Sequence, residues 1–174
     1  MAYLRAEMFR RELLSAPVPV ANGAPSQQPQ RDDLIGTLEI PRLGMCEPIV
    51  EGDGDRALAH SIGHLPDTPL PWQPGNTAVA AHRDTVFRPL ARIRVGDLIA
   101  INTERQRYQY MVRETRIVEP DDLSVLQNGP VPSLTLITCY PFRFIGPAPK
   151  RFIVHAERVA TNSRDRSDCR NGGL

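Results

Sequence analysis

The stretch Leu134-Thr135-Leu136-Ile137-Thr138-Cys139-Tyr140-Pro141-Phe142 decides how this sequence is interpreted. Leu134 to Ile137 is an apolar run with high β propensity, and Pro141 cannot donate a hydrogen bond to a neighbouring strand. The pattern therefore predicts a strand that ends at the thiol of Cys139. A side chain at a strand end is held by the sheet and faces a loop where a ligand has room. Cys139 is either a candidate nucleophile or a small core residue, and the strand alone does not choose.

The rest of the sequence is typical of one β-rich domain. The chain has 174 residues, enough for a single domain with a substantial core. Its 17 prolines and 12 glycines separate short apolar runs, which predicts many turns and little helix. The 21 Lys and Arg residues nearly balance the 20 Asp and Glu residues, so no strong field draws the protein to nucleic acid or to an anionic membrane. A binding partner is therefore expected in a pocket.

The three cysteines, Cys46, Cys139 and Cys169, form an odd number at long spacings. They indicate neither a disulfide framework nor a structural metal site, because the sequence has no Cys-X-X-Cys pair. His60 and His64 match no common zinc-ligand spacing. We therefore expect no metal and no cofactor. A bridge between Cys46 and Cys169 remains open, although the polar surroundings of Cys169 favour a free thiol there.

The composition divides the chain into three parts. Residues 1–33 are predicted to form a short amphipathic helix over Ala2 to Leu14, followed by a linker rich in proline and polar residues. Residues 34–160 are predicted to form the folded domain, and residues 161–174 a disordered tail. The apolar stretches are all shorter than the roughly 18 residues of a membrane-spanning helix, so the chain as given is expected to be soluble.

Short alternating or apolar runs predict seven or eight strands in the folded domain. The clearest runs are Leu34–Ile40, Met45–Val50, Thr77–His82, Leu98–Asn102, Tyr108–Val118, Leu134–Cys139 and Arg151–Val159. Short helical turns are expected after Asp55, Val86 and Pro120. So many short strands with so little helix predict an all-β fold, a closed or nearly closed β-barrel.

Three reactive side chains lie at predicted strand ends. Cys139 ends one strand, His82 ends another, and Arg151 begins a third, so one rim of a barrel could hold all three. A thiol beside an imidazole forms the reactive thiolate more readily. The thiolate would attack an amide carbonyl, and a guanidinium would stabilise the oxyanion that forms. Taken singly, each residue also fits a structural role, as a core thiol, a strand-end histidine or a surface cation.

The same residues carry a resemblance to the sortase family. Thr135 to Cys139 resembles the family motif Thr-Leu-X-Thr-Cys, and His82 upstream and Arg151 downstream stand in the family order. Residues 36–41, 63–64 and 70–76 resemble further motifs, and the similarity extends over about residues 34 to 159. The resemblance implies a cysteine transpeptidase on a closed eight-stranded sortase-type β-barrel with short helices and 3-10 turns. The residues that follow Cys139 most resemble class D sortases.

The resemblance also implies a role for each site residue. Cys139 would be the nucleophile that cleaves a Leu-Pro-X-Thr-Gly-like or Leu-Pro-X-Thr-Ala-like sorting signal after the Thr and holds it as a thioester. His82 would exchange protons with the leaving and incoming amines. Arg151 would stabilise the oxyanion or hold the substrate backbone, with Arg143 as the alternative guanidinium.

By the same resemblance, Thr138 and His64 would contact the substrate. The partners would be the sorting signal of a secreted protein and an amine acceptor, either a peptidoglycan cross-bridge or a pilin lysine. Family members are usually anchored by an N-terminal helix at the extracytoplasmic face of the bacterial membrane, and residues 1–33 resemble the segment that follows such an anchor. Two alternatives remain open, a cysteine hydrolase at the same site and a non-catalytic β-barrel that binds peptides.

Overall fold

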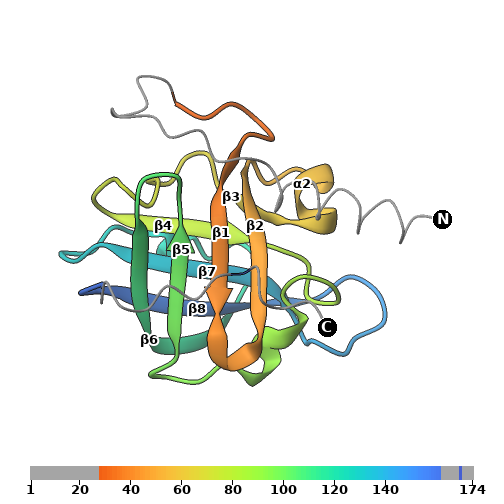
Figure 1. Ribbon diagram of the computed structural model, residues 1–174. Coiled ribbons are helices and arrows are strands. Elements are labelled where there is room, and N and C mark those ends of the chain that lie inside the picture. Colours follow the sequence, from red (N-terminus) through yellow and green to blue (C-terminus); the bar gives the residue numbers. More distant parts are fainter. Residues whose placement is uncertain (1–27, 162–168, 170–174) are drawn as a thin grey trace.

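The computed structural model describes residues 28–161 and Cys169 (Figure 1). Its elements are β1 (Leu34–Ile40), η1 (Pro41–Leu43), β2 (Met45–Glu51), α2 (Asp55–His60), β3 (Ile62–His64), β4 (Asn76–Ala80), η2 (Arg88–Arg92), β5 (Leu98–Asn102), β6 (Arg107–Val118), η3 (Leu123–Leu126), β7 (Ser133–Tyr140) and β8 (Lys150–Val159). The predicted helix over Ala2 to Leu14 and most of the predicted linker and tail lie outside the described residues. None of the described helices has the length and apolar character needed to cross a membrane.

The eight strands form a closed barrel in the order β1-β2-β3-β4-β7-β8-β6-β5. Neighbouring strands are antiparallel except for β2 with β3 and β4 with β7, which are parallel. In Figure 1, β1, β2, β5 and β6 run upright, whereas β4, β7 and β8 run across them. Closure pairs the two edges of the sheet with each other, which removes exposed strand edges. The predicted all-β class and the eight-stranded barrel are confirmed.

Apolar side chains from every strand fill the barrel. The largest fully buried side chains of this core are Tyr110, Leu38, Ile40, Ile49, Ile62, Ile99, Ile101, Leu134 and Leu136 from strands, and Phe87 and Leu90 from the segment around η2. In β7, Leu134, Leu136 and Thr138 are buried, whereas Ile137 and Cys139 are only partly buried. Because successive side chains of a strand point to opposite faces, Ile137 and Cys139 share the outer face of the sheet. The thiol is therefore not part of the barrel core.

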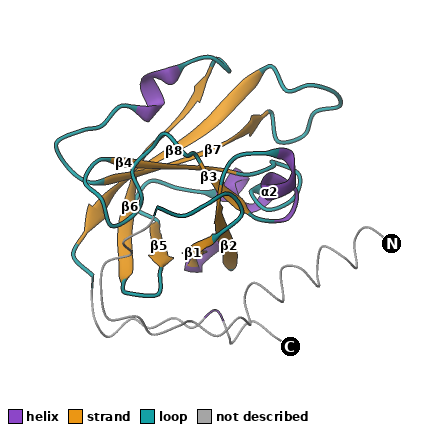
Figure 2. Cartoon of the chain, turned by 90° about the horizontal axis from the view of Figure 1, so that it is seen from above, coloured by secondary structure: helices purple, strands orange, loops and turns teal. Residues whose placement is uncertain are grey.

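The strand β3 has only three residues, and the sequence patterns did not predict it. It pairs in parallel with β2 and in antiparallel with β4, so it closes the barrel between them. A Cβ atom on Gly63 would lie 2.3 Å from the carbonyl oxygen of Gly52, so only glycine permits this close approach. The helix α2 lies outside the barrel beside β2 and β3 (Figures 1 and 2).

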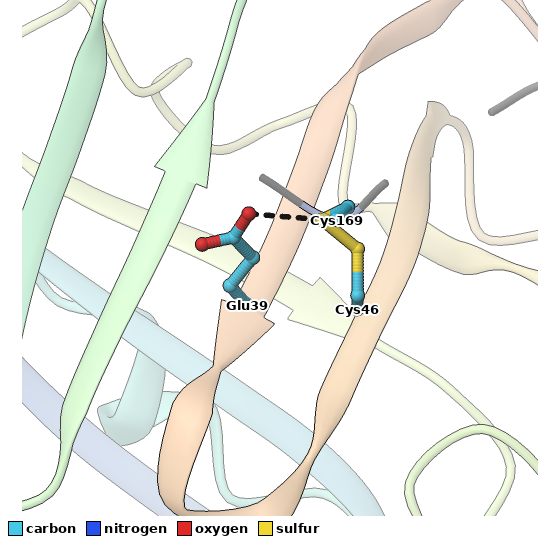
Figure 3. Close-up of side chains that lie close together, drawn as sticks. All are labelled: Glu39, Cys46 and Cys169. Carbon is cyan, nitrogen blue, oxygen red and sulfur yellow. Dashed lines mark hydrogen bonds between the residues drawn. A yellow bond between two sulfur atoms is a disulfide. The ribbon is translucent and has the colours of Figure 1, made fainter. Parts of the chain in front are cut away.

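A disulfide joins Cys46 of β2 to Cys169. Figure 3 shows the bonded pair beside Glu39 of β1, whose Oε1 atom lies 2.9 Å from the Cys169 sulfur. The other carboxylate oxygen of Glu39 accepts a hydrogen bond of 2.8 Å from Arg107, which compensates the burial of this charge. The expectation of a free thiol at Cys169 is therefore wrong, because this residue packs against strands that are remote from it in the sequence.

An ion pair outside the barrel fixes the turn that precedes β5. Both carboxylate oxygens of Asp97 accept hydrogen bonds from Arg42, at 2.5 and 2.7 Å, and one of them also accepts from the backbone N–H of Arg94 at 2.8 Å. The side-chain hydrogen bond from Arg42 is the main cause that lowers the pKa of Asp97 below its usual range. Folding therefore stabilises the charged carboxylate form of Asp97 relative to its protonated form.

This pair predicts a pH-dependent loss of stability. A group whose pKa is lowered by folding contributes stability above its unfolded pKa, about 3.9 for Asp, and that contribution disappears as the pH falls through the folded value. We expect Asp97→Asn to lower Tm by about 2–4 °C at pH 7, and the difference from the wild type to shrink below about pH 4. Thermal unfolding between pH 3 and pH 7 measures this, and an undiminished difference at pH 3 would contradict it.

Candidate active site

Cys139 and Arg151 are direct partners across two neighbouring strands. They face each other in the antiparallel pair formed by β7 and β8. The side chains of such partners lie on the same face of the sheet, with Cβ atoms about 4.5–5.5 Å apart. The Cys139 thiol is free and half-buried. The register of β7 and β8 therefore places Cys139 and Arg151 side by side on one face of the sheet.

His82 is tied to the same strand through the residue that precedes it. The backbone N–H of Ala81 donates to the carbonyl oxygen of Ile137 at 3.3 Å, and the hydroxyl of Thr138 donates to the carbonyl oxygen of Ala81 at 2.8 Å. The next residue, His82, is exposed, two positions beyond the end of β4. The segment that carries the imidazole is thus fastened beside the end of β7, next to Cys139.

A cavity of about 300 Å³ opens on the outer face of the strands that carry these residues. Ala80, Ile137 and Ile153, from β4, β7 and β8, line it together with Arg151. The other lining residues belong mainly to the connection between β6 and β7 and to the segments around α2: Asp53, Leu58, Leu65, Val118, Glu119, Pro120, Asp122, Leu123, Val125 and Leu126. Of the three candidate catalytic residues, Arg151 lines this mostly apolar cavity and Cys139 and His82 do not, although Cys139 lies two residues beyond Ile137 on the same face of β7.

Two arginines were candidates for the guanidinium of the site. Arg151 is half-buried, and its Nη1 atom donates to the carbonyl oxygens of Lys150 at 3.0 Å and Ala148 at 3.4 Å. Arg143 is exposed in the connection between β7 and β8. Arg151 is therefore the guanidinium that the strand register places opposite Cys139.

Thr138 has a structural partner in the protein. Its side chain points away from the face that carries Cys139, the residue is 2% exposed, and its hydroxyl is bonded to Ala81. Direct contact between Thr138 and a substrate stays a prediction. The observed hydrogen bond holds the strand that carries Cys139 against the segment that carries His82.

Removing this hydrogen bond should impair turnover more than substrate binding. We expect Thr138→Val to lower kcat about tenfold and to leave KM within about twofold, because a displaced imidazole slows proton transfer without altering the cavity. Thr138→Ser keeps a hydroxyl and should stay near the wild-type kcat. Steady-state kinetics of the three proteins measures the effect, and a Thr138→Val variant that loses only substrate affinity would favour direct contact instead.

His64 is buried, with both ring nitrogens near protein oxygens. Nδ1 lies 2.7 Å from a carboxylate oxygen of Glu51, and Nε2 lies 3.2 Å from the carbonyl oxygen of Pro69 and 3.2 Å from the hydroxyl of Thr68. These contacts hold the proline-rich connection after β3 against the end of β2. The prediction that His64 contacts the substrate stays untested, and its observed partners indicate a structural role.

The described part of the chain brings together one group of three side chains with metal-ligand atoms, Glu39, Cys46 and Cys169. The two sulfurs of this group are bonded to each other, so neither is a thiolate that could bind a metal. The group also lies on β1 and β2, whereas the reactive thiol, imidazole and guanidinium lie at β4, β7 and β8.

Comparison with known proteins decides the family. The family described as Sortase domain matches residues 38–159, which include Cys139, His82 and Arg151. The chain belongs to the sortase family. Sortases are cysteine transpeptidases that act at the cell surface, which agrees with the thiol site described above.

Individual sortases are similar along most of the chain. Sortase D of Bacillus subtilis (strain 168) is 36% identical over 140 residues, which cover 80% of this sortase and 71% of the relative. A solved Clostridium perfringens Sortase D5 transpeptidase is 30% identical with a TM-score of 0.69, over 76% of this chain and 83% of that one. A sortase from Actinomyces oris is 26% identical with a TM-score of 0.72, over 85% and 94%. The class D resemblance is thus confirmed.

Some residues of the site in this sortase gave no signal in the sequence. The walls of the cavity come from short, irregular segments such as Val118 to Leu126, whose residues share no periodic pattern. The role of Ala81 also depends on its backbone carbonyl, which every residue type offers. The sequence indicated the site only through Cys139, His82 and Arg151, which stand at the ends of predicted strands.

Proposed function

We propose that this sortase cleaves a Leu-Pro-X-Thr-Gly-like or Leu-Pro-X-Thr-Ala-like sorting signal after the Thr and transfers the peptide to an amine. The observation that supports this best is the cross-strand pair of Cys139 and Arg151, of which Arg151 also lines an apolar cavity. His82 completes the group, because the hydrogen bond between Thr138 and Ala81 fastens the segment before it to β7. A thiol, an imidazole and a guanidinium can supply the nucleophile, the proton-transfer group and the oxyanion donor of acyl transfer through a thioester.

The reaction proceeds in two acyl transfers. The Cys139 thiolate attacks the carbonyl carbon of the Thr, and Arg151 stabilises the oxyanion that forms. The C–N bond then breaks, His82 gives its proton to the leaving amine, and the peptide remains as a thioester on Cys139. In the second transfer, His82 takes a proton from the incoming amine while that amine attacks the thioester carbon. A new amide bond forms and the thiolate leaves.

The cavity accounts for an apolar signal. Ala80, Ile137 and Ile153 offer a surface of apolar side chains that would bury an apolar residue of the peptide. Arg151, which lines the same cavity, has donors for the peptide carbonyl groups. Leu123 is 72% exposed on the wall between β6 and β7, where a bound peptide would cover it.

A peptide assay tests the proposal and separates it from the two alternatives. A fluorogenic Leu-Pro-X-Thr-Gly or Leu-Pro-X-Thr-Ala peptide is incubated with and without an amine, and products are identified by mass spectrometry. A transpeptidase gives the amine-linked product. Cleavage that an added amine does not divert would indicate a cysteine hydrolase. Peptide binding without cleavage, unchanged in Cys139→Ala, would indicate a binding module.

The choice between the two guanidinium candidates gives a further prediction. We expect Arg151→Ala to lower kcat/KM about 10²–10³-fold, because the oxyanion loses a fixed donor. Arg143→Ala, a matched change in the connection that precedes β8, should stay within about twofold of the wild type, since exposed side chains away from the chemistry contribute little. Steady-state kinetics measures both, and the reverse ranking would assign the role to Arg143.

We also propose that the sortase works at the extracytoplasmic face of a bacterial membrane, attached in the full-length protein by an N-terminal anchor as family members usually are, with a peptidoglycan cross-bridge or a pilin lysine as the acceptor. The disulfide between Cys46 and Cys169 supports this location, because such bonds persist mainly outside the reducing cytoplasm. Analysis of products formed with a cross-bridge peptide and with a lysine-bearing peptide would identify the acceptor. A clear preference for water over both would overturn this assignment.

A further inference from the structure

Arg83 directly follows the candidate acid His82, and its side chain reaches the connection between β7 and β8. Its Nη2 atom donates to two carbonyl oxygens there, that of Phe144 at 3.1 Å and that of Gly146 at 3.2 Å. Its guanidinium also stacks on the Phe144 ring, with 5.9 Å between Cζ and the ring centroid. Three contacts to the three-residue segment 144–146 set this arginine apart from a solvated surface cation.

The burial of Arg83 agrees with a fixed position. Its Nη1 atom is shielded from solvent, and within the described residues it has no hydrogen-bond partner. Keeping a charged donor without a partner away from water costs free energy, so the other contacts of the side chain must offset that cost. The carbonyl groups and the aromatic ring supply such contacts. Arg83 therefore joins two segments that are more than 60 residues apart in the sequence, with separations of 61 and 63 residues.

The connection that Arg83 holds begins and ends at the candidate catalytic residues. It leaves β7 just after Cys139 and enters β8 just before Arg151, so its path sets the approach to both. Phe142 at its start packs on Phe152, but its middle is little buried, since Phe144 is 46% exposed and Ile145 is 100% exposed. A segment with so few buried apolar side chains has low local stability, and each fixed hydrogen bond matters more.

We propose that Arg83 is a positioning residue that fastens the connection between β7 and β8 to the segment carrying His82. The single side chain thereby couples all three candidate catalytic groups: it follows the imidazole in the sequence and holds the backbone that links the thiol to the guanidinium. This inference rests on the proposed function for its effect on turnover, whereas the mechanical link itself does not depend on it.

Two measurements on three variants test the link. Arg83→Ala removes every contact, Arg83→Lys keeps the charge but not the planar guanidinium, and Arg88→Ala is a matched control at an exposed arginine of η2. Hydrogen exchange of the ladder amides that flank the connection, in residues 138–140 and 150–152, should become about tenfold faster in Arg83→Ala and intermediate in Arg83→Lys, while Arg88→Ala matches the wild type. Unchanged exchange in Arg83→Ala would overturn the proposal.

The kinetic measurement separates positioning from a loss of folding. We expect kcat for the sorting-signal peptide to fall about 10- to 100-fold in Arg83→Ala, with KM within about threefold and partial recovery in Arg83→Lys. Tm should stay within the range of Arg88→Ala. Faster exchange with unchanged kcat would overturn the coupling to catalysis. If the wild type itself turns over no peptide, the proposed function fails, and the exchange data still decide whether Arg83 holds the connection.

Discussion

Replacing Cys139 by alanine is expected to abolish peptide cleavage and transfer, with a loss of at least about 10⁴-fold in kcat. The thiol is the only atom of the site that forms a covalent bond with the substrate in the proposed reaction. His82 and Arg151 cannot replace the thiol, because neither an imidazole nor a guanidinium can form a thioester with the substrate. The fold should survive, since the side chain is only partly buried on the outer face of β7. Peptide turnover and thermal unfolding of the variant measure both expectations.

The disulfide provides a direct control for this prediction. With Cys46 and Cys169 bonded to each other, Cys139 is the one free thiol of the chain. Iodoacetamide under non-reducing conditions should therefore add once, at Cys139, and inactivate the enzyme in proportion to labelling. Turnover that survives either the alanine variant or complete alkylation would remove the covalent mechanism. A thiol that resists alkylation in the native protein would favour the non-catalytic alternative.

Replacing His82 by alanine is expected to lower kcat/KM about 10²–10⁴-fold, the usual contribution of a general acid and base. Both transfers need it, first to protonate the leaving amine and then to deprotonate the incoming one. The wild-type rate should depend on pH as a bell-shaped curve, because a thiolate and an imidazolium must be present together. His82→Ala should lose that shape along with the rate. Kinetics across the pH range measures both features.

His60→Ala is the matched control for this prediction. His60 is an exposed histidine at the end of α2, and the proposed reaction gives it no part. This variant should keep the wild-type rate and the wild-type pH profile. A flat profile in the wild type, or a similar loss of rate in both histidine variants, would contradict the pairing of Cys139 with His82.

The sequence predicted those parts of the fold that obey a local rule. Residues 34–40 and 98–102 were placed within the strands β1 and β5 because their apolar residues stand between clear turn residues. The strand before Cys139 was placed to within one residue, since Pro141 ends the pairing and β7 stops at Tyr140. The predicted strand Thr77 to His82 is too long at its C-terminal end. The observed strand β4 ends at Ala80, and His82 lies two residues beyond it.

The features that sequence reasoning missed depend on contacts between remote segments. Ile62 to His64 is too short to show alternation, and this strand exists because β2 and β4 lie on either side of it. The bond between Cys46 and Cys169 needs two residues 123 positions apart to meet, which spacing alone does not reveal. The contacts of Arg83 likewise join distant segments. In each case the closed barrel brings the two segments together, and the sequence around either segment alone does not indicate the contact.

The disulfide also makes most of this protein a covalent ring. The chain leaves Cys46, passes through β3 to β8 with all three candidate catalytic residues, and returns to the same bond at Cys169. A protease that cuts one peptide bond inside the ring therefore releases no fragment, because both new ends stay attached through the sulfurs. Cys139 and His82 would remain in one covalent molecule even after a nick in the connection between β5 and β6.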